Sequence, residues 1–117
     1  MKQYNILNKI VGWVVFLIAA VTYILTTEDS ASFWDCGEFI SCAHKLDVGH
    51  PPGAPFFMLA GKFASLFASD VTKVAMMVNA LSATFSALTI LFLFLSITHM
   101  AKKLVQNEDK TLTLAQT

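Results

Sequence analysis

Two carboxylates and one histidine in a short stretch are the residues of this chain that could do chemistry. Asp35 and Glu38 are three residues apart, so on a helix both side chains project from the same side. His50 follows and directly precedes two prolines. All three groups can bind and release protons, and strongly apolar sequence flanks them on both sides. Polar chemistry enclosed in this way is typical of a site held at a membrane face.

Each of these residues also has a purely structural explanation. Asp35 could cap a helix, because Ser32-x-x-Asp35 and Asp35-x-x-Glu38 both fit a capping box. Glu38 could be an ordinary first-turn acid that the helix dipole favours. His50 could simply set up the Pro-Pro turn. From the residues alone, the functional and the structural interpretations both stay open.

Metal and nucleotide chemistry find little support in the sequence. Cys36, Cys42, His44 and His50 do not have the spacing of a zinc site. Six residues apart on one helix, the two cysteines would not reach the ~5.5–6 Å Cα separation of a disulfide, so we interpret them as packing residues. The five glycines are scattered and form no phosphate-binding loop. We therefore expect no metal and no other cofactor.

Two apolar runs predict an all-α membrane protein with two transmembrane helices, at residues 6–26 and 74–100. Roughly 20 residues of helix cross a ~30 Å hydrocarbon layer, and both runs are long enough. A signal peptide is the rival interpretation of the first run. Its apolar core is longer than the usual ~7–15 residues, however, and no small-x-small cleavage site follows.

The connection at residues 27–73 is expected to hold two short helices, at about 32–46 and 55–67. The sequence His50-Pro51-Pro52-Gly53 cannot continue a helix, whereas Pro55 suits the first position of the next one. About a dozen residues are too few to span, so we expect the second helix to lie in the membrane interface. The polar tail, 101–117, is interpreted as a linker, and 1–117 as the N-terminal part of one polytopic domain.

The lysines predict the orientation. Lys2 and Lys9 precede the first span, and Lys102, Lys103 and Lys110 follow the second. By the positive-inside rule both termini are cytoplasmic, and the loop 27–73 faces the periplasm, or the lumen in a eukaryote. We expect an integral protein of a bacterial inner membrane. Lysines and acids balance and arginine is absent, so a nucleic-acid partner has no electrostatic support.

Small polar residues on one face of the second span predict a contact with other helices. Asn79, Ser82 and Ser86 recur at three- and four-residue spacing. Alternatively, the hydroxyls bond only to carbonyls of the preceding turn.

The motif around the acids closely resembles a known family. The sequence Trp34-Asp35-Cys36-Gly37-Glu38-Phe39-Ile40, followed by Gly49-His50-Pro51-Pro52-Gly53-Ala54-Pro55-Phe56, resembles the domain-of-unknown-function 2723 family. Its members are polytopic membrane proteins related to protein O-mannosyltransferases, in the GT-C class of glycosyltransferases. Order and spacing match from the first span through the second.

This resemblance implies transfer of a mannose-like sugar from a polyprenyl-phosphate carrier to an acceptor hydroxyl, on protein Ser/Thr or a glycan, at the outer face. A positioned carboxylate would take the hydroxyl proton. The implied catalytic residues are Asp35 and Glu38. The candidates for binding the carrier phosphate are His50, Lys45 and Lys62. The residues implied to shape the motif are Gly37, Pro51, Pro52, Gly53 and Pro55.

The expected partners are membrane lipid, the sugar donor, the acceptor and the remaining helices of a longer chain. Because the family has many spans, we expect an N-terminal fragment that is inactive alone. The rival from another class is a small non-enzymatic membrane hairpin, acting as an assembly or regulatory subunit and associating through the Asn79–Ser82–Ser86 face. A channel or transporter piece is weaker, since neither span carries a central charge.

Overall fold

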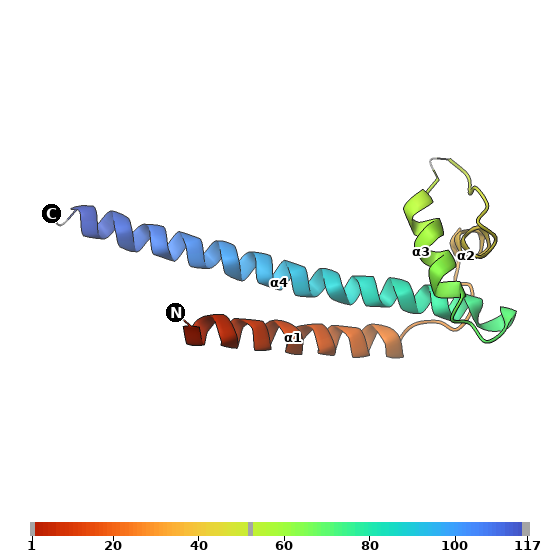
Figure 1. The fold of residues 1–117 in the computed structure, drawn as a ribbon, viewed down its shortest axis with the longest axis horizontal. Helices are drawn as coiled ribbons and strands as arrows, with labels where there is room; N and C mark the ends of the chain where they lie inside the picture. The colour runs from red at the N-terminus through yellow and green to blue at the C-terminus, as the bar shows by residue number, and fades with distance from the viewer. Residues whose placement is uncertain (1, 52, 116–117) are drawn as a thin grey trace. The chain divides into compact units, whose positions relative to one another are not determined.

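The computed structural model describes residues 2–51 and 53–115, with the side chains of residues 3–51 and 53–107. The described residues form no strand, and their helices are α1 (Lys2–Leu25), α2 (Cys36–Lys45), α3 (Pro55–Ser65), a short 3₁₀ helix (Val71–Lys73) and α4 (Val74–Ala115) (Figure 1). The all-α prediction is confirmed. The chain divides into two compact units: the spanning unit, Met1–Ala19 with Ala87–Thr117, and the loop unit, Ala20–Ser86.

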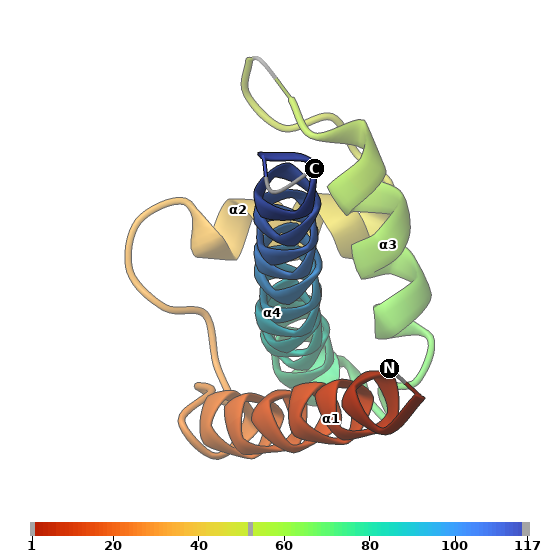
Figure 2. The ribbon, with the colours of Figure 1, turned by 90° about the vertical axis from the view of Figure 1, so that its left-hand side faces the viewer.

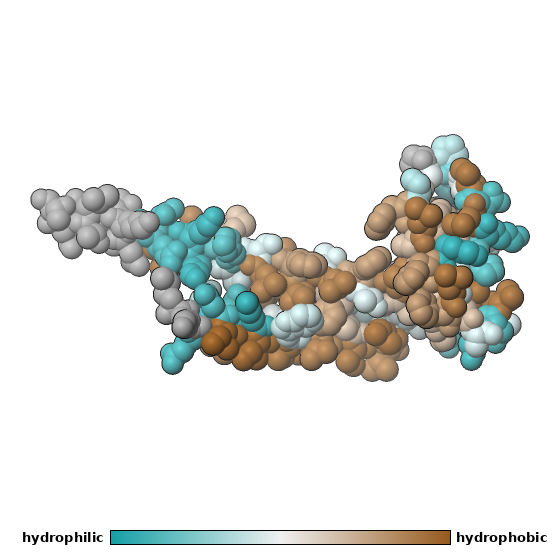
Figure 3. Space-filling view, in the orientation of Figure 1, coloured by the Kyte–Doolittle hydropathy of each residue, from teal (hydrophilic) through white to brown (hydrophobic). Residues whose placement is uncertain are grey.

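Two stretches are long and apolar enough to cross a membrane, namely Gln3–Leu25 and Val71–Asn107. Most of their side chains are not buried within the protein, and Figure 3 shows apolar surface along α1 and the middle of α4. Exposed apolar surface on this scale is costly in water and stable in lipid. The two predicted spans are therefore present as candidate membrane-spanning helices.

Helix α4 continues beyond the second predicted span. The sequence predicted that the helix ends at Met100 and that a polar linker follows, but α4 runs on to Ala115. The segment after Met100 contains neither glycine nor proline and is rich in Ala, Lys, Leu and Gln, which all favour helix. The predicted helix end at Met100 therefore differs from the structure, whereas the role of the tail as a linker stays a prediction; residues 116–117 lie outside the described part.

The spanning unit is held by a close approach and a neutral polar pair. A Cβ atom added at Gly12 would lie 3.3 Å from the side chains of both Leu91 and Phe94, so the absence of a side chain lets α1 approach α4. Asn8 Nδ2 of α1 donates a hydrogen bond to Thr98 Oγ1 of α4 over 3.0 Å. The two helices therefore meet through shape and one uncharged hydrogen bond.

A lysine adds a second polar contact near the N-terminus of α1. Lys102 Nζ donates to Asn5 Oδ1 over 2.9 Å and lies 5.5 Å from the centre of the Tyr4 ring. A cation over an aromatic face is attracted by the ring quadrupole. Lys102, which the positive-inside count places on the cytoplasmic side, thus also ties α4 to α1.

The loop unit is built on the packing of α2 against α3, which Figure 2 shows beside one another. Gly61 of α3 makes this possible, because a Cβ atom there would lie only 2.8 Å from the Cβ of Ala43 in α2. The hydrophobic core beside them consists of Ile40 of α2 with Val74 and Val78 of α4. The start of α4 therefore serves as the floor on which the short helices rest.

The loop unit contains two short helices, α2 and α3, and α2 starts later than the sequence predicted. The sequence predicted a helix from Ser32, but α2 begins at Cys36, and Asp35 in the N-cap position makes no capping bond through its side chain. Trp34 adopts a φ of 68°, which interrupts helical geometry directly before Asp35 and is rare for a bulky residue. Neither predicted capping box forms, and the carboxylate of Asp35 is left available.

The polar face of α4 is used within the chain. Asn79 Nδ2 donates to the backbone oxygens of Glu28 and Ser30, over 3.0 and 3.1 Å, and so ties down the segment that leads into α2. Ser82 Oγ donates to the carbonyl of Val78 in the preceding turn. Asn79 thus contacts the loop and Ser82 follows the local alternative, while a contact of this face with further helices stays a prediction.

Candidate functional site

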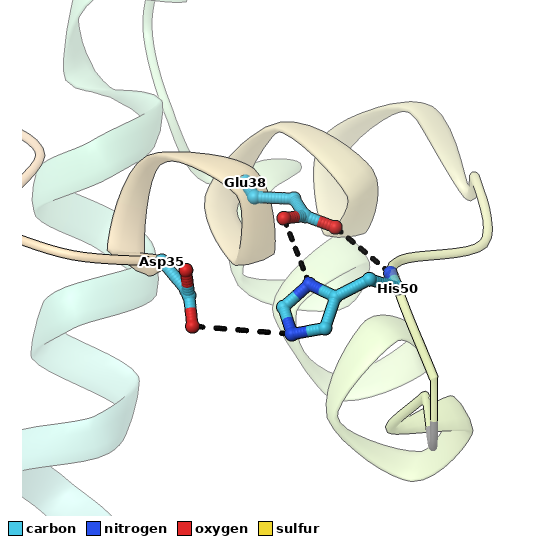
Figure 4. A network of polar contacts seen from close by, with 3 residues as sticks. All are labelled: Asp35, Glu38 and His50. Carbon is cyan, nitrogen blue, oxygen red and sulfur yellow. Dashed lines mark hydrogen bonds and ion pairs between the residues drawn. The ribbon is translucent and has the colours of Figure 1, made fainter.

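The structure brings together the three side chains that the sequence singled out. Asp35 lies at the start of α2, Glu38 one turn later, and His50 on the connection between α2 and α3 (Figure 4). All three are about half exposed, at 48%, 40% and 50% of their side-chain areas. Asp35, Glu38 and His50 are called the acid–histidine cluster below.

Glu38 holds His50 at two points. Its Oε1 accepts a hydrogen bond from the backbone N–H of His50 over 2.8 Å, and its Oε2 lies 2.9 Å from His50 Nδ1. An ionised carboxylate can only accept hydrogen bonds, so the proton on this side of the ring belongs to Nδ1. The two bonds fix both the backbone and the ring of His50, across the twelve residues that separate it from Glu38.

The other side of the imidazole faces Asp35. His50 Nε2 lies 3.9 Å from Asp35 Oδ2 (Figure 4). This distance is an ion-pair distance when the ring is protonated, and it is too long for a hydrogen bond. The ring therefore stands between two carboxylates, bonded to one and within electrostatic reach of the other.

The contacts shift two pKa values in opposite directions. The pKa of Glu38 is lowered from its usual 4.5, first by the backbone N–H of His50 and then by the ring. The pKa of His50 is raised from 6.5, first by the hydrogen bond to Glu38, then by the charge of Glu38, with a smaller contribution from Asp35. Both shifts favour the charged forms, so the cluster is most cohesive as an ion pair.

The turn that carries His50 depends on glycines and proline. A Cβ atom at Gly49 would lie 3.4 Å from Glu38 Oε1, so a small residue lets the carboxylate approach the backbone. Gly53 has a φ of 73°, and its N–H donates to the carbonyl of His50 over 3.0 Å. Pro55 is the first residue of α3, as predicted. Pro51 lies within the turn, and Pro52 is outside the described residues.

The two lysines lie at the other end of α2. Lys62 Nζ donates to the carbonyl of His44 over 2.6 Å, where a cation satisfies a free backbone oxygen at the helix terminus. Lys45 is the last residue of α2 and is exposed. The structure does not bring either lysine to the acid–histidine cluster, and their predicted role at a carrier phosphate stays a prediction.

The cysteine and glycine predictions have different outcomes. Cys36 is half-buried against the core of Ile40, Val74 and Val78, which agrees with a packing role. At Gly37 an added Cβ would meet Ala31 at 3.7 Å, an ordinary contact, so space alone does not require glycine there. The described residues contain no cluster of three or more groups that could hold a metal ion.

Sequence reasoning missed an apolar cavity beside the cluster. It has a volume of about 520 Å³, and its lining includes Gly49, Gly53 and Met58, which also border the acid–histidine cluster. The remaining lining residues are Leu46, Asp47, Val48, Ala54, Pro55 and Leu59. The feature of the sequence that relates to this cavity is the apolar run after Pro55, which by itself predicts a helix in the membrane interface.

The fold and the cluster define an all-helical membrane protein that holds paired acids and a histidine in the segment between two candidate spans. Residues 35–117, which include the whole acid–histidine cluster, match the family described as the Protein O-mannosyl-transferase TMEM260 N-terminal domain. The chain belongs to this family. The relation to protein O-mannosyltransferases that the motif implied is thereby confirmed.

Two curated relatives carry the same name. The chain is 31% identical over 84 residues to the Protein O-mannosyl-transferase tmem260 of Dictyostelium discoideum, an alignment that covers 71% of this chain and 10% of that protein. It is 39% identical over 84 residues to the Protein O-mannosyl-transferase TMEM260 of Mus musculus, covering 71% of this chain and 12% of that protein. The chain thus spans about a tenth of the length of these relatives. No solved structure matches it.

Proposed function

We propose that this chain contributes the catalytic carboxylate, acting as general base, of a membrane glycosyltransferase of the GT-C class. The enzyme transfers a mannosyl group from a polyprenyl-phosphate carrier to a Ser or Thr hydroxyl of a protein. The observation that carries the proposal is the acid–histidine cluster, which lies within the part of the chain that matches an O-mannosyl-transferase family.

Asp35 is the general base in this proposal. An acceptor hydroxyl is a poor nucleophile until a positioned carboxylate takes its proton. As the hydroxyl oxygen bonds to the anomeric carbon, the bond from that carbon to the carrier phosphate breaks, and the proton passes to Asp35. Asp35 suits this role because it makes no capping bond and about half of its side chain is exposed.

The carrier lipid is assigned to the apolar side of the cluster. The cavity that shares Gly49, Gly53 and Met58 with the cluster is lined mostly by apolar groups. Helix α3 also exposes Phe56, Leu59 and Phe63, a surface suited to the membrane interface. A carrier lying there would present its phosphate end near Asp35. With both termini cytoplasmic, the site is on the periplasmic or lumenal face.

Substitution of Asp35 by Asn tests this proposal. The amide cannot accept the acceptor proton, so mannosyl transfer by the intact protein should fall by about 10²–10⁴-fold, the usual contribution of a general base. The measurement is transfer of radiolabelled mannose from a polyprenyl-phosphate donor to a peptide acceptor.

Asp29→Asn is the matched control for that experiment. Asp29 lies in the segment that leads into α2, is exposed, and lines neither the apolar cavity nor the hollow around His50. Its variant should retain activity close to wild type. Full transfer by the Asp35→Asn protein would remove Asp35 as the base and, with it, the proposed mechanism.

A further inference from the structure

The imidazole of His50 has both of its nitrogens facing carboxylates. Nδ1 lies 2.9 Å from Glu38 Oε2, and Nε2 lies 3.9 Å from Asp35 Oδ2. A negative phosphate group would therefore meet two carboxylates beside this ring. The contacts of His50 indicate that it acts on Asp35. The motif, by contrast, implied that His50 binds the carrier phosphate.

We propose that His50, locked by Glu38, is a protonated bridge that positions the Asp35 carboxylate, so that Glu38 and His50 are positioning residues and only Asp35 is catalytic. This inference rests on the proposed function for its activity readout. The bridge itself is a property of the three side chains and can be tested without any transfer assay.

The protonation state follows from the geometry. Glu38 requires the proton on Nδ1. A neutral ring would then turn the lone pair of Nε2 toward the oxygen lone pairs of Asp35, which is repulsive. A protonated ring instead presents N–H groups to both acids. The cluster is therefore stable with His50 charged, and the raised pKa of His50 agrees with this state.

Among the residues that the structure describes, Asp35 and Glu38 are the titratable groups that face the ring. The residues that line the hollow around His50 are Glu38 and Phe39 of α2, Gly49 and Gly53 of the turn, and Met58 of α3. The Phe39 ring meets the imidazole edge to face at 6.2 Å. Within the described part of the chain, Asp35 and Glu38 are thus the two groups to which the charge of His50 responds.

Two neutral amides at position 50 separate positioning from simple structural support. In His50→Asn the amide nitrogen takes the place of Nδ1, so the bond to Glu38 remains and the donor toward Asp35 is lost. In His50→Gln the amide nitrogen takes the place of Nε2, so the donor toward Asp35 remains. The bridge predicts that His50→Gln retains about three- to tenfold more kcat/KM than His50→Asn, the size expected for a half-exposed electrostatic contact between an N–H group and a carboxylate. Equal activity, or higher activity in His50→Asn, overturns the positioning role.

The pH profile supplies a second arm. In the wild-type protein, transfer should fall as pH rises through the raised pKa of His50, because the deprotonated ring no longer presents a positive charge and an N–H group to Asp35. In Glu38→Gln the amide oxygen still accepts from the His50 N–H, but the amide nitrogen favours the tautomer with the proton on Nε2. The neutral ring then keeps its donor, and the loss of activity at high pH should disappear. An unchanged alkaline limb contradicts the bridge.

Direct titration distinguishes a failed bridge from a failed function. NMR of labelled histidine in the protein reconstituted in lipid nanodiscs reports the pKa of His50 without any substrate. The pKa should fall in Glu38→Gln, and by a smaller amount in Asp35→Asn. If these shifts occur but the wild-type protein transfers no mannose, the bridge holds and the proposed function fails. A His50 pKa that is the same in wild type and in both variants overturns the bridge.

Discussion

Each of the two units of this molecule is stabilised internally by a different kind of polar contact. In the spanning unit, Gly12 allows α1 to approach α4, and Asn8 and Thr98 form a neutral hydrogen bond. In the loop unit, a similar close approach at Gly61 lets α2 pack against α3. The connection between these two helices is held by the charged groups of Glu38 and His50. The spanning contacts suit lipid, where charges are costly. The loop contacts respond to protons, which suits the proton transfer proposed for Asp35.

The difference shows where the sequence must be exact. The spanning unit needs apolar residues of about the right size, a small residue at Gly12, and a few polar contacts such as those of Asn8 and Lys102. The loop unit needs particular residues at particular places, because His50 reaches Glu38 only if Gly49 leaves room and Gly53 supplies a positive φ. This contrast predicts large local effects in the loop unit and modest effects in the spanning unit.

The largest effect on stability should come from Gly61→Ala. A methyl group there would lie 2.8 Å from the Cβ of Ala43, so the helices must separate. Overpacking of this kind typically costs about 1–3 kcal/mol, more than the ~0.5–1 kcal/mol that alanine gains over glycine in a helix. Thermal unfolding should occur at lower temperature, and the thiol of Cys36, which packs against the core beside α2, should react faster with maleimide.

Gly37→Ala is the matched control for that experiment. The same change in α2 would place a methyl group at an ordinary 3.7 Å from Ala31, so its stability and Cys36 reactivity should stay close to wild type. If Gly61→Ala proved as stable as Gly37→Ala, the close packing of α2 on α3 would be wrong, and the support under His50 with it.

A smaller effect is expected from Asn8→Ala in the spanning unit. Hydrogen bonds between membrane helices contribute about 0.6 kcal/mol on average, because the unfolded helices find other partners in the bilayer. A double-mutant cycle with Thr98→Ala, followed by unfolding in mixed micelles, should give a coupling of about this size. The pKa of His50 should not change in Asn8→Ala, in Thr98→Ala or in the double variant. A changed pKa would show that contacts in the spanning unit influence the loop unit.

The helices could be predicted from sequence, whereas the contacts between them could not. Hydrophobic run length and the proline turn were sufficient for the two spans and for α2 and α3. The start of α2 was misplaced because the positive φ of Trp34 has no local signal, and the end of α4 because polarity after Met100 was taken for a linker despite good helix formers. Pattern alone therefore located the elements but not all of their ends.

The sequence predicted which residues form the site but not the contacts between them. Asp35, Glu38 and His50 were identified from residue type and motif. Glu38 binds both the backbone and the ring of His50, twelve residues further along the chain. No sequence periodicity predicts a contact over such a connection. The bond from Lys62 to the carbonyl of His44 was not predicted for the same reason, since it joins two helices.

The most direct test of the central claim, that Asp35 and His50 act as one unit, is the transfer activity of a double variant. Groups that act as a unit are not additive, because removing the first already removes what the second contributes. With mannosyl transfer measured on the intact protein, Asp35→Asn combined with His50→Asn should be no less active than Asp35→Asn alone. If the fold-loss of activity in the double variant equals the product of the fold-losses in the two single variants, the residues act independently. That result would rule out His50 as the residue that positions Asp35.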